Sequence, residues 1–460
     1  MEDMTTNRPV NPRRKKKSQL QIFKETYLPV IIAGIALIFI LIFTIGSIVR
    51  AVQRGQYEAK MKQQALEASA AILQQQNQEA EELLAQVKVM AAQYDYVGAM
   101  EAFDGFSGSI ANYPELNDLY QQCKAEREKM VKWTDTNNIP AMSFQMLIAD
   151  PDRAFQDEKY GKSYNKNFIT TDEFTKILHG LYENNFILVK LSDIYADGQV
   201  KELYLPAGKK PIILVETQVN YNTYMIDSDG DKLPDQNGDG FASKLVIDDN
   251  GNITCEMVDS SGSTETGAYD LVPILDSFVA THPDFSYKGA KAVLALTGYD
   301  GLFGYRTNAS ASGIFDVNSE AASAKEVANK LRQTGYELAC YTYENVAYGQ
   351  LENAKILYDM NKWQTEVEPI LGPIDTLVFA RNSDISESTA PYTDEKIDTL
   401  QSFGFKKYLG FCSEAMCWFT EGEGYMRLGR MLITGSELKT HPDWYEDYFN
   451  ASNVIDSSRP

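Results

Sequence analysis

A run of 23 residues without a charged side chain, from Tyr27 to Val49, restricts this chain more than any other feature of its sequence. A helix of this length is about 34 Å long, which is enough to cross a hydrocarbon core of about 30 Å. The run is too long for the apolar part of a secretory signal, and no small-x-small cleavage site follows it. The sequence therefore predicts a transmembrane helix over residues 27–49.

The charges on either side of this run predict its orientation. Residues 1–26 hold seven Lys or Arg, five of them in the cluster from Arg13 to Lys17, against three Asp or Glu. Basic residues beside a membrane-spanning helix favour the cytoplasmic side, so we expect a single-pass protein whose extracellular part begins at Arg50. The formal net charge is −21 for the whole chain and −25 without residues 1–26. Such acidity argues against nucleic acid as a partner.

Five cysteines are few and irregularly spaced for an exported chain, and an odd number cannot all pair. No disulfide framework is predicted, although the spacing of Cys412 and Cys417 permits one bridge. The chain lacks the P-loop, GxGxxG, GxSxG and HExxH motifs, which removes the usual nucleotide-binding, serine hydrolase and zincin classes.

Residues 50–133 are expected to form an extracellular helical stalk. The part from 50 to 93 has no Pro and is rich in Ala, Gln, Glu and Lys, which predicts one long helix. Its heptad seam fits two interpretations, a parallel coiled-coil homodimer with Asn77 in the core or one amphipathic helix that packs on its own neighbours. The residues that follow resemble a single tetratricopeptide-like hairpin, and we interpret it as a spacer because a repeat array needs about three units for stability.

From Ile139 onward, short apolar segments alternate with helical segments. The strand-like segments are MSFQMLI, FILVKLSDI, PIILV, KAVLALTG, ELACYTY, DTLVFA and KYLGFC. Strands separated by helices predict parallel βα units. About seven such units suit an α/β domain over residues 139–450, with the form of an incomplete and distorted (β/α) barrel, followed by a tail at 451–460.

The third of these strands carries a resemblance to a known family. It runs from PIILV through Glu216, Thr217 and Gln218 into the tripeptide VNY at residues 219–221. This segment resembles the first motif of the polysaccharide deacetylase family (the NodB homology domain), which reads close to [ST]FDD and in one branch continues as VNY. The resemblance places Thr217 where the family has its general base and Gln218 where it has a metal-binding aspartate.

Segments downstream continue the resemblance. They are residues 287–308, residues 334–349 and the strand VFARN at 378–382. The second segment aligns with the family's HSxxH motif, whose two metal-binding histidines correspond here to Cys340 and Glu344. The resemblance covers about two thirds of the chain and implies the barrel fold of this family.

The departures from the family pattern fall on its catalytic positions. Thr and Gln supply neither an anionic ligand nor a general base near pH 7, whereas a Zn, Co or Ni hydrolase needs two or three protein ligands and an open position for water. The three histidines of the chain form no metal-binding spacing; they are His179, His282 and His441. We therefore predict a catalytically inactive module, without a transition metal, that binds cell wall or surface polysaccharide.

Two alternatives stay open at this point. One is an active, metal-dependent deacetylase of N- or O-acetyl groups with relocated ligands, since a thiolate at Cys340 and a carboxylate at Glu344 are legitimate metal ligands. The other is a structural scaffold of a membrane complex, held through the helical stalk.

An Asp-rich stretch opens an insertion at residues 225–269. Carboxylates at alternate positions of DSDGDKLPDQNGDG resemble thrombospondin type 3 and dockerin-like calcium loops. The candidate ligands are Asp227, Asp229, Asp231, Asp235 and Asp239. The stretch is not an EF-hand, because Gly falls at position 4 and position 12 is Gly238. A weak calcium site and an acidic, solvated turn both fit, and the Asn-Gly pair that follows predicts a β-hairpin.

Overall fold

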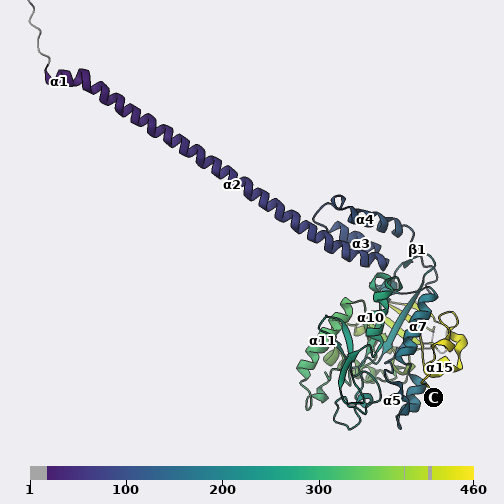
Figure 1. Ribbon diagram of the computed structural model, residues 1–460. Helices are drawn as coiled ribbons and strands as arrows, with labels where there is room; N and C mark the ends of the chain where they lie inside the picture. Colours follow the sequence, from purple (N-terminus) through teal and green to yellow (C-terminus); the bar gives the residue numbers. More distant parts are fainter. Residues whose placement is uncertain (1–17, 388, 413–416) are drawn as a thin grey trace, which may run out of the picture. The chain divides into compact units, whose positions relative to one another are not determined.

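The computed structural model describes residues 18–387, 389–412 and 417–460, and the chain divides into two compact units, 1–81 and 82–460 (Figure 1). The predicted basic cluster from Arg13 to Lys17 lies outside the described residues. Cys412 and Cys417 flank a segment that also lies outside them, and all five cysteines are free.

The first unit is helical from Gln19 to its end. The helix begins as α1 (Gln19–Ile22), passes through the π-helical turn η1 (Phe23–Tyr27) and continues as α2 (Leu28–Ala92), which enters the second unit. Apolar side chains such as Phe39 and Phe43 are exposed along it. By length and composition this helix is compatible with a membrane span. Helices over 27–49 and 50–92 are therefore confirmed, whereas the membrane crossing, its orientation and the coiled coil stay predictions.

Two shorter helices begin the second unit after α2. They are α3 (Tyr96–Asp104) and α4 (Pro114–Arg127), separated by the 3-10 turn η2 (Ile110–Asn112). Asp95 caps α3 by accepting the N–H of Gly98 at 3.0 Å. Phe103 on α3 meets Tyr120 on α4 edge to face, with ring centroids 5.3 Å apart. The helices form the pair that the sequence predicts, and we call them the helical hairpin.

Seven parallel strands close into a barrel. They are β2 (Ala141–Gln145), β7 (Lys210–Thr217), β11 (Ala292–Leu296), β12 (Glu337–Cys340), β13 (Thr376–Val378), β14 (Lys407–Phe411) and β16 (Tyr425–Leu432). Each strand pairs with the next along the chain, and β16 pairs with β2. The α/β class and the barrel are confirmed in this coarse form, but the barrel is closed and not incomplete.

Helices occupy the connections between these strands. The longer ones are α7 (Thr171–Glu183), α10 (Leu271–Thr281), α11 (Val317–Gln333), α12 (Asn353–Lys362) and α14 (Glu395–Ser402). The shorter ones are α5 (Pro151–Gln156), α6 (Gly161–Asn167), α8 (Leu191–Ile194), α9 (Thr223–Ile226), α13 (Glu368–Leu371), α15 (Gly435–Thr440) and α16 (Ala451–Val454). In α11 the buried residues Ala324, Val327, Ala328 and Leu331 follow helical spacing, so one face packs on the sheet and the other meets solvent.

The structure corrects two strand predictions. Segment FILVKLSDI is not one strand, because only β3 (Phe186–Leu188) is extended and the next residues form α8. β3 pairs with the start of β7, and β11 pairs with the same edge of β7 further along, from Leu214 to Thr217. The seventh barrel strand is β16, which the apolar pattern missed because Arg427 and Arg430 interrupt it.

Alternation along the strands divides the buried residues into two layers. The inner layer fills the barrel and includes Ala141, Ile213, Val215, Val293, Ala295, Ala339, Val378, Leu409, Met426 and Leu428. The outer layer lies between the strands and the helices, with Phe144, Leu214 and Leu294 among its members. Polar residues that end the strands therefore face either the barrel interior or this outer layer.

The insertion forms a small antiparallel sheet. It contains β8 (Lys244–Ile247), β9 (Ile253–Val258) and β10 (Thr264–Gly267), and the predicted Asn-Gly turn joins the first two. Asp248 organises that turn by accepting the N–H groups of Asn250 and Asn252. Four short strands lie elsewhere, β1 (Val131–Lys132) with β6 (Tyr204–Leu205) and β4 (Tyr195–Ala196) with β5 (Gln199–Val200). β15 (Phe419–Gly422) runs antiparallel to β16.

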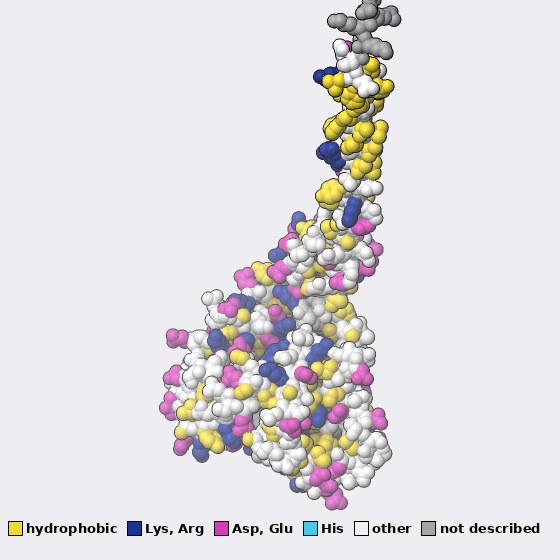
Figure 2. All heavy atoms as spheres, turned by 90° about the vertical axis from the view of Figure 1, so that its left-hand side faces the viewer, with side chains coloured by type: hydrophobic (Ala, Val, Ile, Leu, Met, Phe, Trp, Pro, Cys, Tyr) yellow, Lys and Arg dark blue, Asp and Glu magenta, His cyan; other side chains and the backbone are white. Residues whose placement is uncertain are grey.

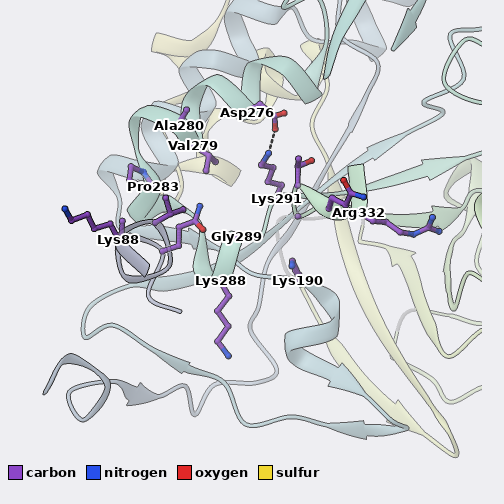
Figure 3. A pocket seen from close by; sticks show the side chains of 16 residues that line it. Lys88, Lys190, Asp276, Val279, Ala280, Pro283, Lys288, Gly289, Lys291 and Arg332 are labelled. Atoms are coloured by element: carbon purple, nitrogen blue, oxygen red, sulfur yellow. Dashed lines mark hydrogen bonds and ion pairs between the residues drawn. The ribbon is translucent and has the colours of Figure 1, made fainter. Parts of the chain in front are cut away.

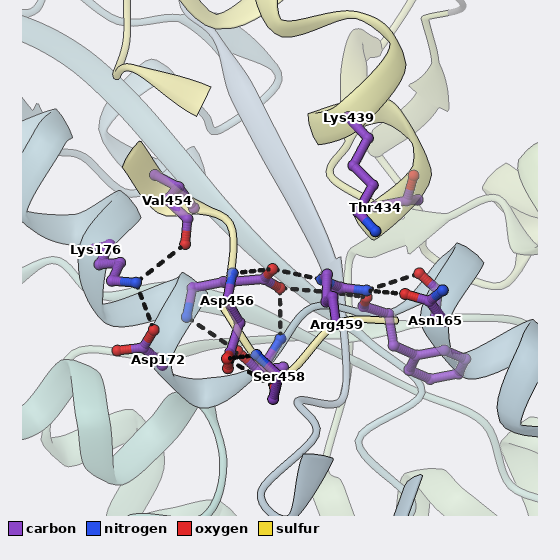
Figure 4. Close-up of polar contacts among 12 residues, drawn as sticks. Asn165, Asp172, Lys176, Thr434, Lys439, Val454, Asp456, Ser458 and Arg459 are labelled. Carbon is purple, nitrogen blue, oxygen red and sulfur yellow. Dashed lines mark hydrogen bonds and ion pairs between the residues drawn. The ribbon is translucent and has the colours of Figure 1, made fainter. Parts of the chain in front are cut away.

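The last residues are not a loose tail, because Arg459 is buried against the first turn of α7 (Figure 4). Its Nε and Nη2 donate to the two carboxylate oxygens of Glu173 at 2.5 and 2.6 Å. Its Nη1 donates to the main-chain and side-chain oxygens of Asn165 at 2.7 and 2.9 Å. We call this arrangement the C-terminal clasp; it makes residues 455–460 part of the barrel unit.

Candidate functional site

The carboxyl ends of the barrel strands form the mouth where α/β barrels place their chemistry. Thr217 ends β7 on the inner face, is 1% exposed, and its hydroxyl donates to the carbonyl oxygen of Phe144 at 3.1 Å. Gln218 follows in the left-handed region at φ 62°, and its Oε1 accepts from Nδ2 of Asn345 at 3.2 Å. The two residues at the family's aspartate positions thus lie at the mouth as neutral, hydrogen-bonded side chains.

The other two family positions have different surroundings. Cys340 faces the outer layer, since its neighbour Ala339 fills the barrel. Burial, with the nearby Asp359 carboxylate, raises the pKa of the Cys340 thiol well above its usual value, so the thiolate that binds metals is disfavoured. Glu344 pairs with Lys362 at 2.8 Å. Among the described residues, Cys340 and Glu344 do not join any group of three or more potential metal ligands.

A residue that the sequence analysis missed occupies the barrel interior. Arg430 of β16 is 1% exposed and on the same inner face as Leu428. Its guanidinium donates to Oγ of Ser143 at 3.2 Å, to the carbonyl oxygen of Phe379 at 2.9 Å and to Oδ1 of Asn382 at 3.2 Å. A fixed cation therefore lies among the strand ends, and it disfavours a second cation such as a metal ion nearby. The signal that could have identified it is an Arg within a segment whose other residues alternate as in a strand, but that segment was not predicted as a strand.

Glu216, the third polar residue at the end of β7, points away from the mouth. It is fully buried in the outer layer, and no N–H or O–H group donates to either of its carboxyl oxygens. Burial, the nearby charge of Asp270 and a hydrogen bond with that carboxylate raise the pKa of Glu216 well above its usual value. Burial raises the pKa of Asp270 as well, but the N–H of Leu147 donates to Asp270 at 2.9 Å and favours its charged form, so Glu216 is the member of the pair that keeps the proton.

The VNY tripeptide has a structural role in the loops of the mouth. Asn220 donates to the carbonyl oxygen of Thr297 at 2.8 Å and accepts the N–H of the same residue at 3.0 Å. Buried Arg306 donates to the carbonyl oxygens of Tyr221 at 2.7 Å and Asp300 at 2.6 Å. These bonds tie the loop after β7 to the loop after β11.

Two tyrosines are exposed on these tied loops. Tyr224 is 46% exposed and Tyr299 is 38% exposed. Thr223 donates from its backbone N–H and hydroxyl to Asp300, which holds the two loop segments together. Exposed aromatic rings beside polar groups provide a surface on which a flat, partly apolar ligand can lie.

The Asp-rich stretch gathers three of its five candidate ligands. Asp227, Asp229 and Asp235 place one oxygen each within 4.8 Å of one another. Asp231 instead accepts the N–H of Leu233, and Asp239 hydrogen-bonds to the hydroxyl of Tyr164. Calcium binding by this stretch stays a proposal, with three carboxylates as its ligands.

We expect calcium to stabilise this loop if the three carboxylates bind it. Calcium at ten times its dissociation constant raises the free energy of unfolding by about 1.4 kcal/mol. The measurement is the melting temperature of the full chain with and without calcium. Asp229→Asn should abolish the increase and Asp249→Asn in the β8–β9 turn should not; an equal increase in both variants would contradict the site.

Comparisons with known proteins give little beyond this geometry. No family model matches the chain, and no curated protein matches it. Among solved structures, a deacetylase from Streptococcus pyogenes, PplD, in complex with acetate, is similar with a TM-score of 0.36 and 13% identity. That alignment covers 68% of this chain and 98% of the deacetylase. A similarity this distant assigns no family.

Proposed function

We propose that this chain is a membrane-anchored, extracellular, deacetylase-like protein whose barrel mouth binds an acetylated cell wall or surface polysaccharide without hydrolysing it. The observation that carries the proposal is the set of side chains at the mouth. Thr217 and Gln218 are neutral there, and the buried cation Arg430 lies among the strand ends. No general base or metal-binding group stands among these three side chains, so they cannot activate water.

The loops that rim the mouth supply the binding surface in this proposal. Tyr224 and Tyr299 offer ring faces, and Arg381 lies beside them with its Nε donating to the carbonyl oxygen of Asn345 at 2.7 Å. Aromatic faces together with amide and guanidinium donors suit a sugar that carries acetamido groups. The anchor and its orientation rest on the apolar helix and on the basic residues before it.

The test combines retention with catalysis. Full chain in nonionic detergent should be retained on an insoluble acetylated amino-sugar polymer and release no acetate from it, with or without added zinc, cobalt or nickel. Tyr299→Ala should reduce retention about tenfold, and the matched variant Tyr358→Ala, an exposed tyrosine of α12, should not. Metal-dependent acetate release that a chelator abolishes would replace this proposal with an active deacetylase. If Tyr299→Ala is retained as well as Tyr358→Ala, the loops that rim the mouth are not the binding surface.

A further inference from the structure

A cavity of about 650 Å³ opens at the end of the barrel opposite the mouth. Lys291, directly before β11, and Gly335, two residues before β12, line it, so the cavity belongs to the amino ends of the strands. The last turns of α2 and the end of α11 complete its walls, with Lys88 and Arg332 among the lining residues. It shares no lining residue with the mouth described above.

Basic side chains dominate this cavity although the chain as a whole is acidic. The basic lining residues are Lys88, Lys190, Lys288, Lys291 and Arg332, and the acidic one is Asp276 (Figure 3). Asp276 is paired with Lys291. Three further acids approach from neighbouring elements: Glu115 at 3.8 Å from Lys88, Asp193 beside Lys190 and Lys288, and Glu337, which accepts the N–H groups of Leu191 and Ser192. The five cations exceed the four acids, in a chain whose net charge is −21.

The cations are spread around the cavity. In Figure 3, Lys88, Lys288 and Arg332 point in different directions, whereas Lys291 points toward Asp276. In Figure 2, Lys and Arg side chains lie among Asp and Glu side chains on the visible face of this unit. One compact anion cannot contact cations arranged in this way, but a chain that carries several negative charges can. Between the cations the lining is partly apolar. The apolar lining residues are Val89, Ala92, Val279, Ala280 and Pro283, and the neutral polar ones are Gln93, Gln333 and Thr334.

The backbone of the cavity wall is rigidly placed. Gly335 has φ 104°, a conformation that favours glycine, and its carbonyl oxygen accepts the N–H of Lys291 at 3.1 Å. A Cβ at this position would lie 1.8 Å from the carbonyl oxygen of Gly289, so the two glycines approach each other closely. A wall that is fixed before binding lowers the entropy lost when a ligand is bound.

We infer that this cavity binds a phosphodiester polymer, meaning a chain of phosphate groups joined by short carbon units. Lys and Arg donate charge-assisted hydrogen bonds to phosphate oxygens, and several of them suit phosphates repeated along one chain. The apolar lining contacts the carbon units between the phosphates. The site is separate from the proposed glycan site at the mouth, so either can exist without the other.

The experiment measures binding of fluorescent poly(glycerol phosphate) to the full chain in nonionic detergent. The double variant Lys288→Gln/Arg332→Gln should weaken binding about tenfold or more, because two charge-assisted contacts are lost. The control Lys162→Gln/Lys166→Gln removes two exposed charges from α6, outside the cavity, and should leave affinity unchanged. Binding should also weaken as salt rises. Equal melting temperatures of wild type and both double variants establish that folding is intact. If the melting temperature of Lys288→Gln/Arg332→Gln is lower, the single variant Arg332→Gln, at an exposed position, takes its place.

Three outcomes would overturn the inference. Equal weakening in the two double variants would mean that bulk charge, including the basic N-terminal residues, accounts for the binding. If wild type does not bind the polymer, phosphodiester polymers are excluded as ligands of the cavity. Cavity-dependent binding of phosphatidylglycerol vesicles without polymer binding would assign the cavity to a lipid headgroup. Retention on the acetylated glycan is measured on the same variants, so failure here is distinguishable from failure at the mouth.

Discussion

Replacing Arg459 by Met should lower the free energy of unfolding by about 3–5 kcal/mol, because it leaves the buried carboxylate of Glu173 without its partner. The side chains of this pair are 1% and 0% exposed, so water cannot replace the lost hydrogen bonds. Arg459 also donates to the carbonyl oxygen of Phe168 at 2.7 Å, which the variant leaves unsatisfied. Urea unfolding of the full chain in nonionic detergent, followed by tryptophan fluorescence, measures the change.

The neighbouring Lys439 provides the matched control for the clasp. Its Nζ donates to the carbonyl oxygen of Pro460 at 3.1 Å in an exposed position, so Lys439→Met should change the free energy of unfolding by less than about 1 kcal/mol. The double variant Glu173→Gln/Arg459→Met removes both charges and should recover part of the loss. A loss below about 1 kcal/mol in Arg459→Met would show that the clasp does not hold the C-terminal residues.

The clasp also illustrates what the sequence pattern could not predict. Arg459 and Glu173 are 286 positions apart, and each belongs to a polar segment that is typical of a solvated surface. Their pairing requires α7 and the last residues to lie on the same side of the barrel, which depends on strand order. An apolar run such as PIILV indicates a buried strand from neighbouring residues alone, so β7 and β11 were predicted correctly. A buried ion pair between distant residues has no such pattern in the sequence around either residue.

The candidate site divides in the same way. The strand ends at Thr217 and Gln218 could be placed at the mouth from the sequence, because the carboxyl ends of parallel strands share one edge. The direction in which each side chain points could not be predicted from the sequence, because it depends on the register of each strand within the barrel. Cys340 was aligned with a metal-binding position, but alternation turns it into the outer layer. Arg430 was missed because β16 itself was not predicted.

Replacing Glu216 by Gln should remove a loss of stability that wild type undergoes as pH rises. The folded-state pKa of Glu216 is raised above the unfolded value of about 4.5. Between these two values the folded chain therefore holds a proton that the unfolded chain has released. Stability is then highest below the unfolded pKa and falls with rising pH by about 1.4 kcal/mol per pH unit, until the folded pKa is reached.

A neutral amide at position 216 has no proton to lose, and it still offers Asp270 a hydrogen-bond donor. Relative to wild type, Glu216→Gln should therefore gain about 1.4 kcal/mol for each pH unit above the unfolded pKa, which urea unfolding at pH 5, 6 and 7 measures. Glu326→Gln, at an exposed position of α11, controls for the loss of a carboxylate and should follow wild type at every pH. Parallel curves for wild type and Glu216→Gln would mean that Glu216 is ionised in the folded chain, and the description of a proton shared with Asp270 would be wrong.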